Sequence, residues 1–520
     1  MNRQIFTQNF SALFFVLSAF CCSAGAVDAT PAASPASSAA TKPEEKIPEG
    51  KVFITKHQMM VGATTLSYTA TTGTMLMKND KDEPIALFGF TAYVKDGGDQ
   101  SVRPIVFAYN GGPGSSSAWL HMGILGPKRA VLNDLESNTK GPFRSVSNEF
   151  TVLDHADLVL IDPIGTGLSH PVGKAEGKDF WGVDQDIKSV SSFIIKYVSQ
   201  NNRWASPKFV LGESYGGMRT AGVANALLSK NVALNGVILV SPFMDFINGF
   251  AGFKSDVPYV NFLTTYASTA WYHHALASRP DDLQPFLREV EAFARDVYAP
   301  VLLKGSRATA AERQNVLQGL ARYTGVSADY WDKANLRLDE SHFLQELLRS
   351  KGIVVGRIDS RYKGNTIAPN SETVNYDPYE SAVGPQMVAA FNDYLRSDLK
   401  VQTETEYAFS NYEVGKDWDW RHAQPDSDGN KLPFPNTGVD LAYAMNKNPN
   451  MKVLIQSGYF DLACPYGAVE YVVDHLDIPQ NLKGNIDIQY YLAGHMMYVH
   501  PESMKKFKTT VANFIDANSK

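Results

Sequence analysis

Six short, continuously apolar runs recur along the chain, and each ends in a glycine-rich or polar turn. Such runs are typical of strands that are buried on both faces of a parallel sheet. Segments with helical periodicity, such as 184–200, lie between several of them and complete β-α-β units. The pattern predicts an α/β fold with a mostly parallel central sheet. The runs occupy 104–109 (PIVFAY), 156–161 (ADLVLI), 208–211 (KFVL), 236–240 (GVILV), 452–456 (KVLIQ) and 487–492 (DIQYYL).

Two stretches depart from this rhythm. Residues 86–93 (ALFGFTAY) alternate between apolar and small or polar positions, which indicates early antiparallel strands. Between 246 and 435 strand signals are few, and helical patterns occupy 283–297, 310–323, 341–349 and 385–395. We interpret 246–435 as a largely helical cap, inserted into a core that consists of 51–245 and 436–520.

The N-terminal residues predict export. One positive charge at Arg3 is followed by a short apolar run at 11–22 and by small residues at 24–26 (AGA). This is the pattern of a secretory signal peptide, and the run is too short to span a membrane comfortably. We therefore expect 1–26 to be removed and 27–50, rich in Ala, Ser and Pro, to be a flexible leader of a periplasmic or secreted protein. A buried helix at 11–22 and lipidation at Cys21 or Cys22 are weaker alternatives, because bulky Phe20 precedes the cysteines.

Cleavage at this position would leave Cys464 as the single cysteine, so no internal disulfide is expected. The 520 residues suggest one elaborated domain or two, and 44% hydrophobic with 20% charged residues is typical of a soluble globular protein. A net charge of −6 gives no reason to expect nucleic acid or an anionic membrane as a partner. No metal or other cofactor is expected, since the chain has no HExxH pattern, phosphate loop or dinucleotide fingerprint.

The strongest local motif is GESYG at 212–216, which directly follows the run 208–211 and fits G-x-S-x-G. A serine on a tight turn between a strand and a helix presents its hydroxyl above the sheet, and the flanking glycines leave room for the backbone. Ser214 is therefore the candidate nucleophile. A purely structural glycine turn is the alternative, and the helix-compatible segment after the motif disfavours it.

A serine hydroxyl is a weak nucleophile and needs a base that is itself oriented. In this arrangement the acid and then the histidine follow the serine along the chain. Asp461 follows the run 452–456, and His495 follows the run 487–492, so both are expected at strand ends. His475, within a predicted helix, and His500, past the turn, are less favoured as the base.

An oxyanion hole is the remaining requirement for acyl transfer. One donor is expected from the backbone N–H after the nucleophile, which belongs to Tyr215. The second is expected from an earlier strand-end loop, and 110–114 (NGGPG) fits because its glycines let the backbone approach a developing charge.

Four segments together resemble the motifs of the serine carboxypeptidase family (peptidase family S10), here as a bacterial-type member. They are NGGPGSSS at 110–117, DPIGTGLSH at 162–170, GESYGG at 212–217, and the pair SGYFDLAC at 457–464 with AGHMM at 493–497. The resemblance implies an α/β-hydrolase fold and an enzyme that removes C-terminal residues from peptides without a metal, best in mild acid. It further implies that Gly112 and Tyr215 supply the oxyanion-hole amides, and that Asn110 and Glu213 bind the substrate's terminal carboxylate.

Glu213 can bind another carboxylate only when one of the two carries a proton, because like charges repel. We therefore expect substrate binding to weaken as the pH rises, unless Glu213 only braces the turn. The chain departs from the family pattern at Ile124, where a second glutamate is common, and at Ser115, where many relatives have cysteine. Cys464 matches a family cysteine and is expected to be a packing residue.

Three functions remain open on the sequence. The leading hypothesis is a serine carboxypeptidase that acts on peptides through an acyl-enzyme on Ser214. Because Ile124 replaces the second glutamate, an esterase or acyltransferase on the same triad is the alternative. A non-catalytic binding protein on a hydrolase scaffold is the third, and the complete set of motifs argues against it. Neither the side-chain preference nor the oligomeric state can be predicted from these patterns.

Overall fold

The fold is described from a computed structural model, which covers residues 49–136, 140–252 and 255–520. The predicted signal peptide 1–26 and residues 27–48 of the predicted leader lie outside the described residues. From Ile47 to Lys520 the chain forms one compact unit.

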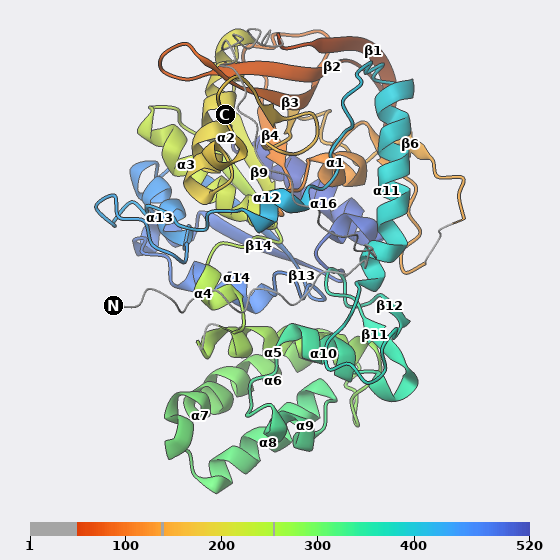
Figure 1. The fold of residues 1–520 in the computed structure, drawn as a ribbon, viewed down its shortest axis with the longest axis vertical. Helices are drawn as coiled ribbons and strands as arrows, with labels where there is room; N and C mark the ends of the chain where they lie inside the picture. The colour runs from red at the N-terminus through yellow and green to blue at the C-terminus, as the bar shows by residue number, and fades with distance from the viewer. Residues whose placement is uncertain (1–48, 137–139, 253–254) are drawn as a thin grey trace, which may run out of the picture. The chain divides into compact units, whose positions relative to one another are not determined.

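A ten-stranded mixed sheet runs through the described residues (Figure 1). Its strand order is β1-β2-β3-β7-β4-β9-β10-β13-β14, and β8 (His170–Pro171) pairs with β3. The last six strands in this order, β7-β4-β9-β10-β13-β14, are parallel to one another. This confirms the predicted α/β class with a mostly parallel sheet. The parallel strands are β4 (Ile105–Tyr109), β7 (Asp157–Ile161), β9 (Lys208–Glu213), β10 (Gly236–Val240), β13 (Lys452–Gly458) and β14 (Ile486–Tyr491).

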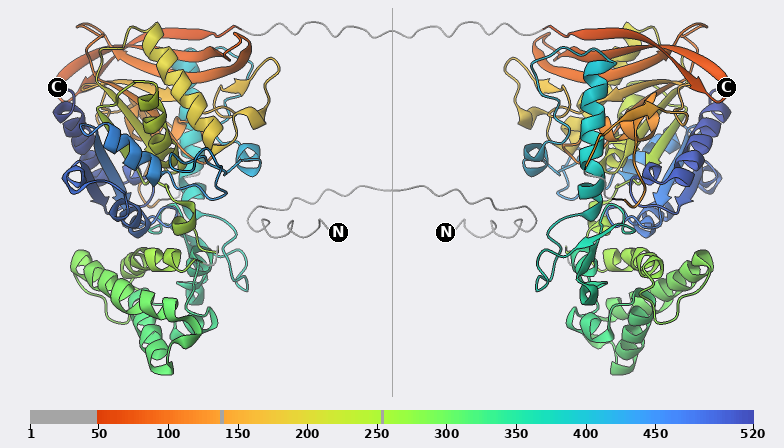
Figure 2. Two further views of the ribbon diagram at one scale, coloured as in Figure 1. Left: turned by 90° about the vertical axis from the view of Figure 1, so that its left-hand side faces the viewer. Right: turned by 90° about the vertical axis from the view of Figure 1, so that its right-hand side faces the viewer.

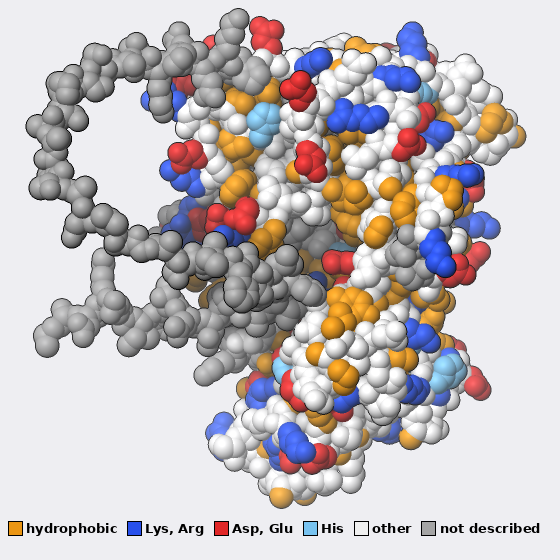
Figure 3. All heavy atoms as spheres, turned by 45° about the vertical axis from the view of Figure 1, so that its right-hand side comes forward, with side chains coloured by type: hydrophobic (Ala, Val, Ile, Leu, Met, Phe, Trp, Pro, Cys, Tyr) orange, Lys and Arg blue, Asp and Glu red, His pale blue; other side chains and the backbone are white. Residues whose placement is uncertain are grey.

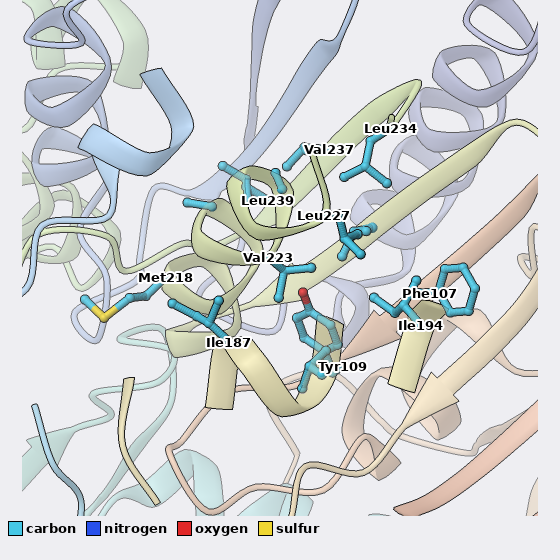
Figure 4. Packing of buried hydrophobic residues seen from close by; sticks show 14 of the residues in the cluster. Phe107, Tyr109, Ile187, Ile194, Met218, Val223, Leu227, Leu234, Val237 and Leu239 are labelled. Atoms are coloured by element: carbon cyan, nitrogen blue, oxygen red, sulfur yellow. The ribbon is translucent and has the colours of Figure 1, made fainter. Parts of the chain in front are cut away.

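Side chains of the parallel strands alternate between two hydrophobic clusters, because successive residues of a strand point to opposite faces. On β4, Phe107 and Tyr109 belong to the first cluster, whereas Val106 and Ala108 belong to the second. Figure 4 shows part of the first cluster, where these two aromatic rings lie near aliphatic side chains of two helices. The sheet is thus buried on both faces, which explains why its strands read as unbroken apolar runs.

Different helices cover the two faces. The first cluster takes in α2 (Val183–Gln200), α3 (Tyr215–Ser229) and α13 (Gly438–Lys447), and the second takes in η1 (His121–Leu125), α11 (Pro378–Ser397) and α16 (Pro501–Ala517). The predicted helix 184–200 is α2 to within one residue.

The sheet begins with three long antiparallel strands, β1 (Val52–Val61), β2 (Thr64–Lys78) and β3 (Pro84–Lys95). The expected strand at 86–93 is the middle of β3, so this part of the prediction is confirmed. β3 then pairs antiparallel with β7 and joins the ribbon to the parallel strands.

The stretch 246–435, predicted to be one helical cap, contributes residues to all three hydrophobic clusters, and its residues Phe246, Val414 and Trp418 belong to the first. Its first part carries a third hydrophobic cluster around α5 (Val257–Tyr272), α6 (Leu283–Phe293), α8 (Ala310–Thr324), α9 (Ala328–Lys333) and α10 (Glu340–Glu346). These helices form a group of their own in Figures 1 and 2. Its second part, from Tyr379 to Phe409, instead packs into the second cluster of the sheet. The boundaries of core and cap stay a prediction.

The two ends of this stretch lie together. Asp245 and Asn436 form an isolated antiparallel bridge, and the Phe246 N–H donates to the Pro435 carbonyl at 2.9 Å. The chain therefore enters and leaves this stretch at one place, which we call the neck and which consists of Asp245, Phe246, Pro435 and Asn436. None of the described helices is long and apolar enough to cross a membrane.

Candidate active site

Loops at the carboxyl ends of β4, β9, β10, β13 and β14 line a cavity of about 230 Å³. β4 lies between β7 and β9, so the chain leaves it toward one side and later returns on the other. Open α/β sheets place their sites beyond the strand ends at such a reversal of strand order. The residues that line the cavity include Asn110, Gly112, Glu213, Ser214, Tyr215 and His495.

Ser214 stands between β9 and α3 in a backbone conformation that only a tight turn imposes, with φ 63° and ψ −128°. A non-glycine residue with positive φ is strained, and serine nucleophiles of this type occupy such a turn. The turn closes tightly: a Cβ atom on Gly212 would lie 2.1 Å from the Gly216 carbonyl oxygen. Gly212 is therefore required by space, whereas a Cβ atom on Gly216 would make only a tight contact, 3.2 Å from the Tyr109 carbonyl oxygen.

His495 and Asp461, predicted as base and acid, are brought together by the loops after β14 and β13. His495 Nδ1 lies 2.8 Å from Asp461 Oδ2, and both side chains are buried. Asp461 Oδ1 accepts hydrogen bonds from the backbone N–H groups of Ala463 and Cys464, each at 2.8 Å. A carboxylate held in this way accepts the Nδ1 proton and leaves Nε2 of the imidazole for chemistry.

The electrostatics of this pair stabilise the positive imidazole that forms when His495 accepts a proton. Burial opposes protonation of His495, but the adjacent Asp461 carboxylate outweighs it and raises the pKa of His495 well above its usual value. Cys464 lies against the same imidazole, and burial raises the pKa of its thiol. The possible ligand atoms of these three residues lie within 4.8 Å of one another. Since the carboxylate and imidazole already bond to each other, this group belongs to the site itself.

The predicted oxyanion loop lies against the turn that holds Ser214. A Cβ atom on Gly111 would be 2.5 Å from the Tyr215 nitrogen, so the two backbones are in contact. Gly112 has φ +102°, a value that L side chains rarely adopt, and it lines the cavity together with Tyr215. The structure therefore brings both predicted donor residues to the cavity that Ser214 lines.

A buried ion pair beneath the site was not predicted from the sequence. Arg219 Nε donates to Asp186 Oδ2 at 2.6 Å, and Arg219 Nη1 donates to the Asn110 carbonyl at 2.6 Å. The Tyr215 hydroxyl also donates to Asp186 Oδ2, at 3.3 Å. One ion pair thus connects the loop after β4 with the helix after β9. No motif indicated this ion pair, because α2, α3 and the loop after β4 come together only in the folded protein.

The loop at 417–437, between α12 (Tyr412–Lys416) and α13, covers Tyr215. Trp418 and Trp420 pack edge-on against the Tyr215 ring, at centroid distances of 5.3 and 5.8 Å. His422 holds this loop in place: its Nδ1 lies 2.6 Å from Asp184 Oδ1 and its Nε2 lies 2.8 Å from Asp440 Oδ2.

Glu213 and Asn110, predicted to bind a carboxylate, are in direct contact. Asn110 Nδ2 donates to Glu213 Oε1 at 2.7 Å, and Asn110 Oδ1 accepts the Leu120 N–H at 3.0 Å. Burial is the main cause that raises the pKa of Glu213 to about 7, although His495, Tyr498 and Asn110 oppose it. Glu213 is therefore neutral below that pH and able to donate a proton in a hydrogen bond to an anion.

Ile124, at the position of the missing glutamate, does not line the cavity. It is fully buried within η1 and belongs to the second hydrophobic cluster. Its neighbour Gly123 packs against the ring of Tyr498, where a Cβ atom would lie 2.3 Å from the ring carbon Cε2. An aromatic ring thus fills the space beside this turn.

The remaining cavity wall comes from residues within 246–435 and from Phe243, which lies just before this segment. Arg357, Tyr379 and Trp420 line the cavity from three separate segments. No motif in the sequence identified them. The two less favoured histidines lie elsewhere: His475 stacks on Tyr471, and His500 caps the N-terminus of α16 by accepting the Ser503 N–H.

Comparisons with known proteins agree with this geometry. A family model described as serine carboxypeptidase matches residues 66–498. Pheromone-processing carboxypeptidase KEX1 of Saccharomyces cerevisiae is 35% identical over 136 residues, which are 25% of this chain and 17% of that protein. Serine carboxypeptidase-like 36 of Arabidopsis thaliana is 24% identical over 242 residues, which are 43% of this chain and 48% of that protein. The chain thus spans less than half the length of either relative.

A solved structure, Kex1(Δ)p, a prohormone-processing carboxypeptidase from Saccharomyces cerevisiae, superposes with a TM-score of 0.53 at 15% sequence identity. The superposition covers 87% of this chain and 91% of that one. At this identity the likeness concerns the fold alone, and it confirms the predicted α/β-hydrolase fold.

Proposed function

Because the chain belongs to the serine carboxypeptidase family, we propose that it releases C-terminal residues from peptides through an acyl-enzyme on Ser214. One observation carries the proposal. Ser214, in its strained turn, shares a cavity with the His495–Asp461 pair, whose Nδ1–Oδ2 distance is 2.8 Å. Peptides are the proposed substrates, and no cofactor is needed for the steps below.

In the proposed reaction, His495 Nε2 takes the proton of the Ser214 hydroxyl while Oγ attacks the last peptide carbonyl. Asp461 holds the imidazole through Nδ1 and stabilises its positive form. The backbone N–H groups of Gly112 and Tyr215 bind the oxyanion of the tetrahedral intermediate. The C–N bond then breaks, and His495 gives the proton to the leaving amine. Water hydrolyses the acyl-enzyme by the same steps in reverse order.

Glu213 and Asn110 are proposed to bind the terminal carboxylate of the substrate. The Glu213 carboxyl is buried beside the nucleophile and neutral below about pH 7, so it can donate to an anion without repelling it. Binding should therefore weaken as the pH rises and Glu213 ionises. A bound terminal carboxylate places the last peptide bond at Ser214, so removal of a single C-terminal residue should be the favoured reaction.

We also propose that the protein is exported to the periplasm or secreted, with cleavage after residue 26, and that 246–435 acts as a cap over the site. The apolar run 11–22 and the small residues that follow support export. The paired neck at Asp245 and Asn436 supports an insertion with these ends.

The test is hydrolysis of N-blocked dipeptides from pH 4 to pH 8, with free and with amidated C-termini. We expect wild type to cleave only the free acid and Ser214→Ala to cleave neither. Equal cleavage of free and amidated dipeptides would contradict the carboxylate site, and full activity of Ser214→Ala would contradict the nucleophile.

An esterase or acyltransferase is the second candidate, and the burial of Ile124 away from the cavity favours it. Without a second carboxyl group, recognition of the free C-terminus rests on fewer groups. Simple esters are therefore added to the same experiment as further substrates. Activity on the esters with no cleavage of either dipeptide would assign this function instead.

A further inference from the structure

Three polar atoms without a hydrogen-bond partner are buried beside the carboxylate subsite. Within the described part of the chain they are Glu213 Oε2, the Tyr498 hydroxyl and the Tyr379 hydroxyl. All three side chains are at least 98% buried. A buried polar atom without a partner costs roughly 1–3 kcal/mol. Three such atoms in one place point to a group that binds there or to hydrogen bonds that form when it does.

These atoms come from three distant elements. Glu213 ends β9, Tyr498 lies in η6 (Met497–Val499) three residues after His495, and Tyr379 is in the first turn of α11. Burial raises the pKa of both phenols, and the Glu213 carboxylate adds to this in each case, so both hydroxyls lie near it. Tyr498 is close enough to lower the pKa of Glu213, although its hydroxyl and Oε2 do not form a well-aligned hydrogen bond.

The two tyrosines face the site differently. Glu213 and Tyr379 line the cavity, whereas Tyr498 does not. The Tyr498 ring is held against the backbone of Gly123, where even a methyl group would clash. Its hydroxyl lies close enough to the side chains of Glu213 and Asn110 for both to act on its pKa.

We propose that Tyr498 is a positioning residue that takes the place of a second carboxyl group: its hydroxyl donates to Glu213 Oε2, while Tyr379 donates to the bound carboxylate from the cavity side. This rests on the proposed function, since it names how the same subsite recognises a free C-terminus. A phenol brings a donor without a second negative charge. The subsite therefore ionises once, at Glu213, and does not share one proton between two carboxyls.

The titratable groups that act on the pKa of Glu213 include Tyr498, His495 and Asp461, and Tyr379 lies nearby. Arg357, Glu380 and Cys464 also line the cavity that Glu213 lines. His495 lowers the pKa of Glu213 and Asp461 raises it. The triad residues remain the same in the variants below, so a change in the pH dependence isolates the contribution of the phenol.

The experiment measures KM for a free-acid N-blocked dipeptide from pH 4 to pH 9 in wild type and Tyr498→Phe. Loss of a donor to the ionised carboxylate raises the pKa of Glu213, so the midpoint at which KM increases should shift upward by about one pH unit. Tyr379→Phe is the matched variant. It removes a hydroxyl from the cavity side, so it should raise KM several-fold at low pH.

A double-mutant cycle tests whether Tyr498 acts through Glu213. In the Glu213→Gln background, Tyr498→Phe should cause no further change of the pH profile. A midpoint that stays unchanged in Tyr498→Phe, or a shift that persists without Glu213, would overturn the proposal. If wild type and Glu213→Gln both show no preference for the free acid, the proposed function itself fails.

A measurement on the wild-type protein keeps the proposal testable if Tyr498→Phe does not fold. The infrared difference spectrum between wild type and Glu213→Gln reports the carboxyl C=O band of Glu213 as the pH is varied. One carboxyl group that titrates in a single step is expected. Two coupled steps would mean that a second carboxyl shares the proton, and would contradict the role of Tyr498.

Discussion

The end of β9 and the 417–437 loop each bury an ionisable side chain, and the two regions treat its polar atoms in opposite ways. Both nitrogens of His422 bond to carboxylates, at 2.6 and 2.8 Å. Glu213 has a partner for one oxygen only, and two phenols beside it have none. A fully paired group fixes a loop, whereas unpaired groups remain available to a ligand. His422 therefore holds the structure together, whereas Glu213 and the two phenols are the groups that we propose meet a substrate.

The largest effect should come from Ser214→Ala. Removal of the nucleophile is expected to lower kcat on the order of 10⁶-fold, as for other triads. Since the backbone turn stores strain rather than stability, Tm should stay within a few degrees of wild type. Steady-state kinetics and thermal unfolding of the same preparation check both. A large drop in Tm would show that the Ser214 side chain also stabilises the fold.

His422→Gln should act on stability first. The variant leaves the buried Asp440 without its cation, and loss of one partner of a buried ion pair costs about 3–5 kcal/mol. Asp184 is about a quarter exposed and keeps its ion pair with Lys431, so it adds little to this cost. We expect a clear fall in Tm at pH 7, while kcat of the protein that remains folded changes little. Asp419→Asn, which removes a carboxylate paired with an exposed arginine in the same loop, is the control.

The pH dependence of His422 has a definite sign. Burial lowers the pKa of His422, but Asp184 and Asp440 outweigh it and raise the pKa to about 9. The stability that the charged histidine contributes is therefore fully present below its unfolded pKa and is lost as the pH rises through about 9. His422→Gln should remove this alkaline decline of Tm, and an unchanged decline would refute the assignment.

Glu213→Gln should change Tm by less than His422→Gln does, and in the opposite direction, because it should raise Tm. The pKa of Glu213 is raised from 4.5 to about 7, so the folded state loses stability as the pH rises through that interval, on the order of 3 kcal/mol for full ionisation. The variant cannot ionise, so its Tm should exceed that of wild type at pH 8 and match it near pH 4. Equal Tm values of variant and wild type at both pH values would show that Glu213 ionises without a cost in stability, as a fully paired group would.

Much of the parallel sheet could be predicted from sequence because each strand is apolar throughout. The run 236–240 coincides with β10, and β9 continues two residues beyond its predicted end, into the motif. The polar ribbon of β1 and β2 gave no comparable signal. α5 was not predicted because it is buried on most sides, its Asn, Ser and Thr residues included, and it has no exposed charged face. The helix expected at 385–395 begins at Pro378, because Pro385 is tolerated inside α11.

The site divides in the same way. Ser214, Asp461 and His495 follow strand ends, where a local pattern identifies them, and the structure brings the imidazole and carboxylate to 2.8 Å. Tyr379 and Tyr498 meet Glu213 only after segments more than a hundred residues apart have packed together. No local spacing in the sequence predicts these contacts. The burial of the two phenols and their unpaired hydroxyls, seen only in the folded protein, indicate their role.

The neck at Asp245 and Asn436 also bears on how such an enzyme could diversify. Segments whose two ends lie side by side are the ones that proteins most readily accept, lose or exchange. Between the ends of this segment lie Arg357, Tyr379 and Trp420, which form one wall of the cavity, whereas the nucleophile, base and acid lie outside it. A different segment grafted at the same two residues would present new side chains to an unchanged reaction centre. Substrate choice and chemistry can therefore be inherited separately.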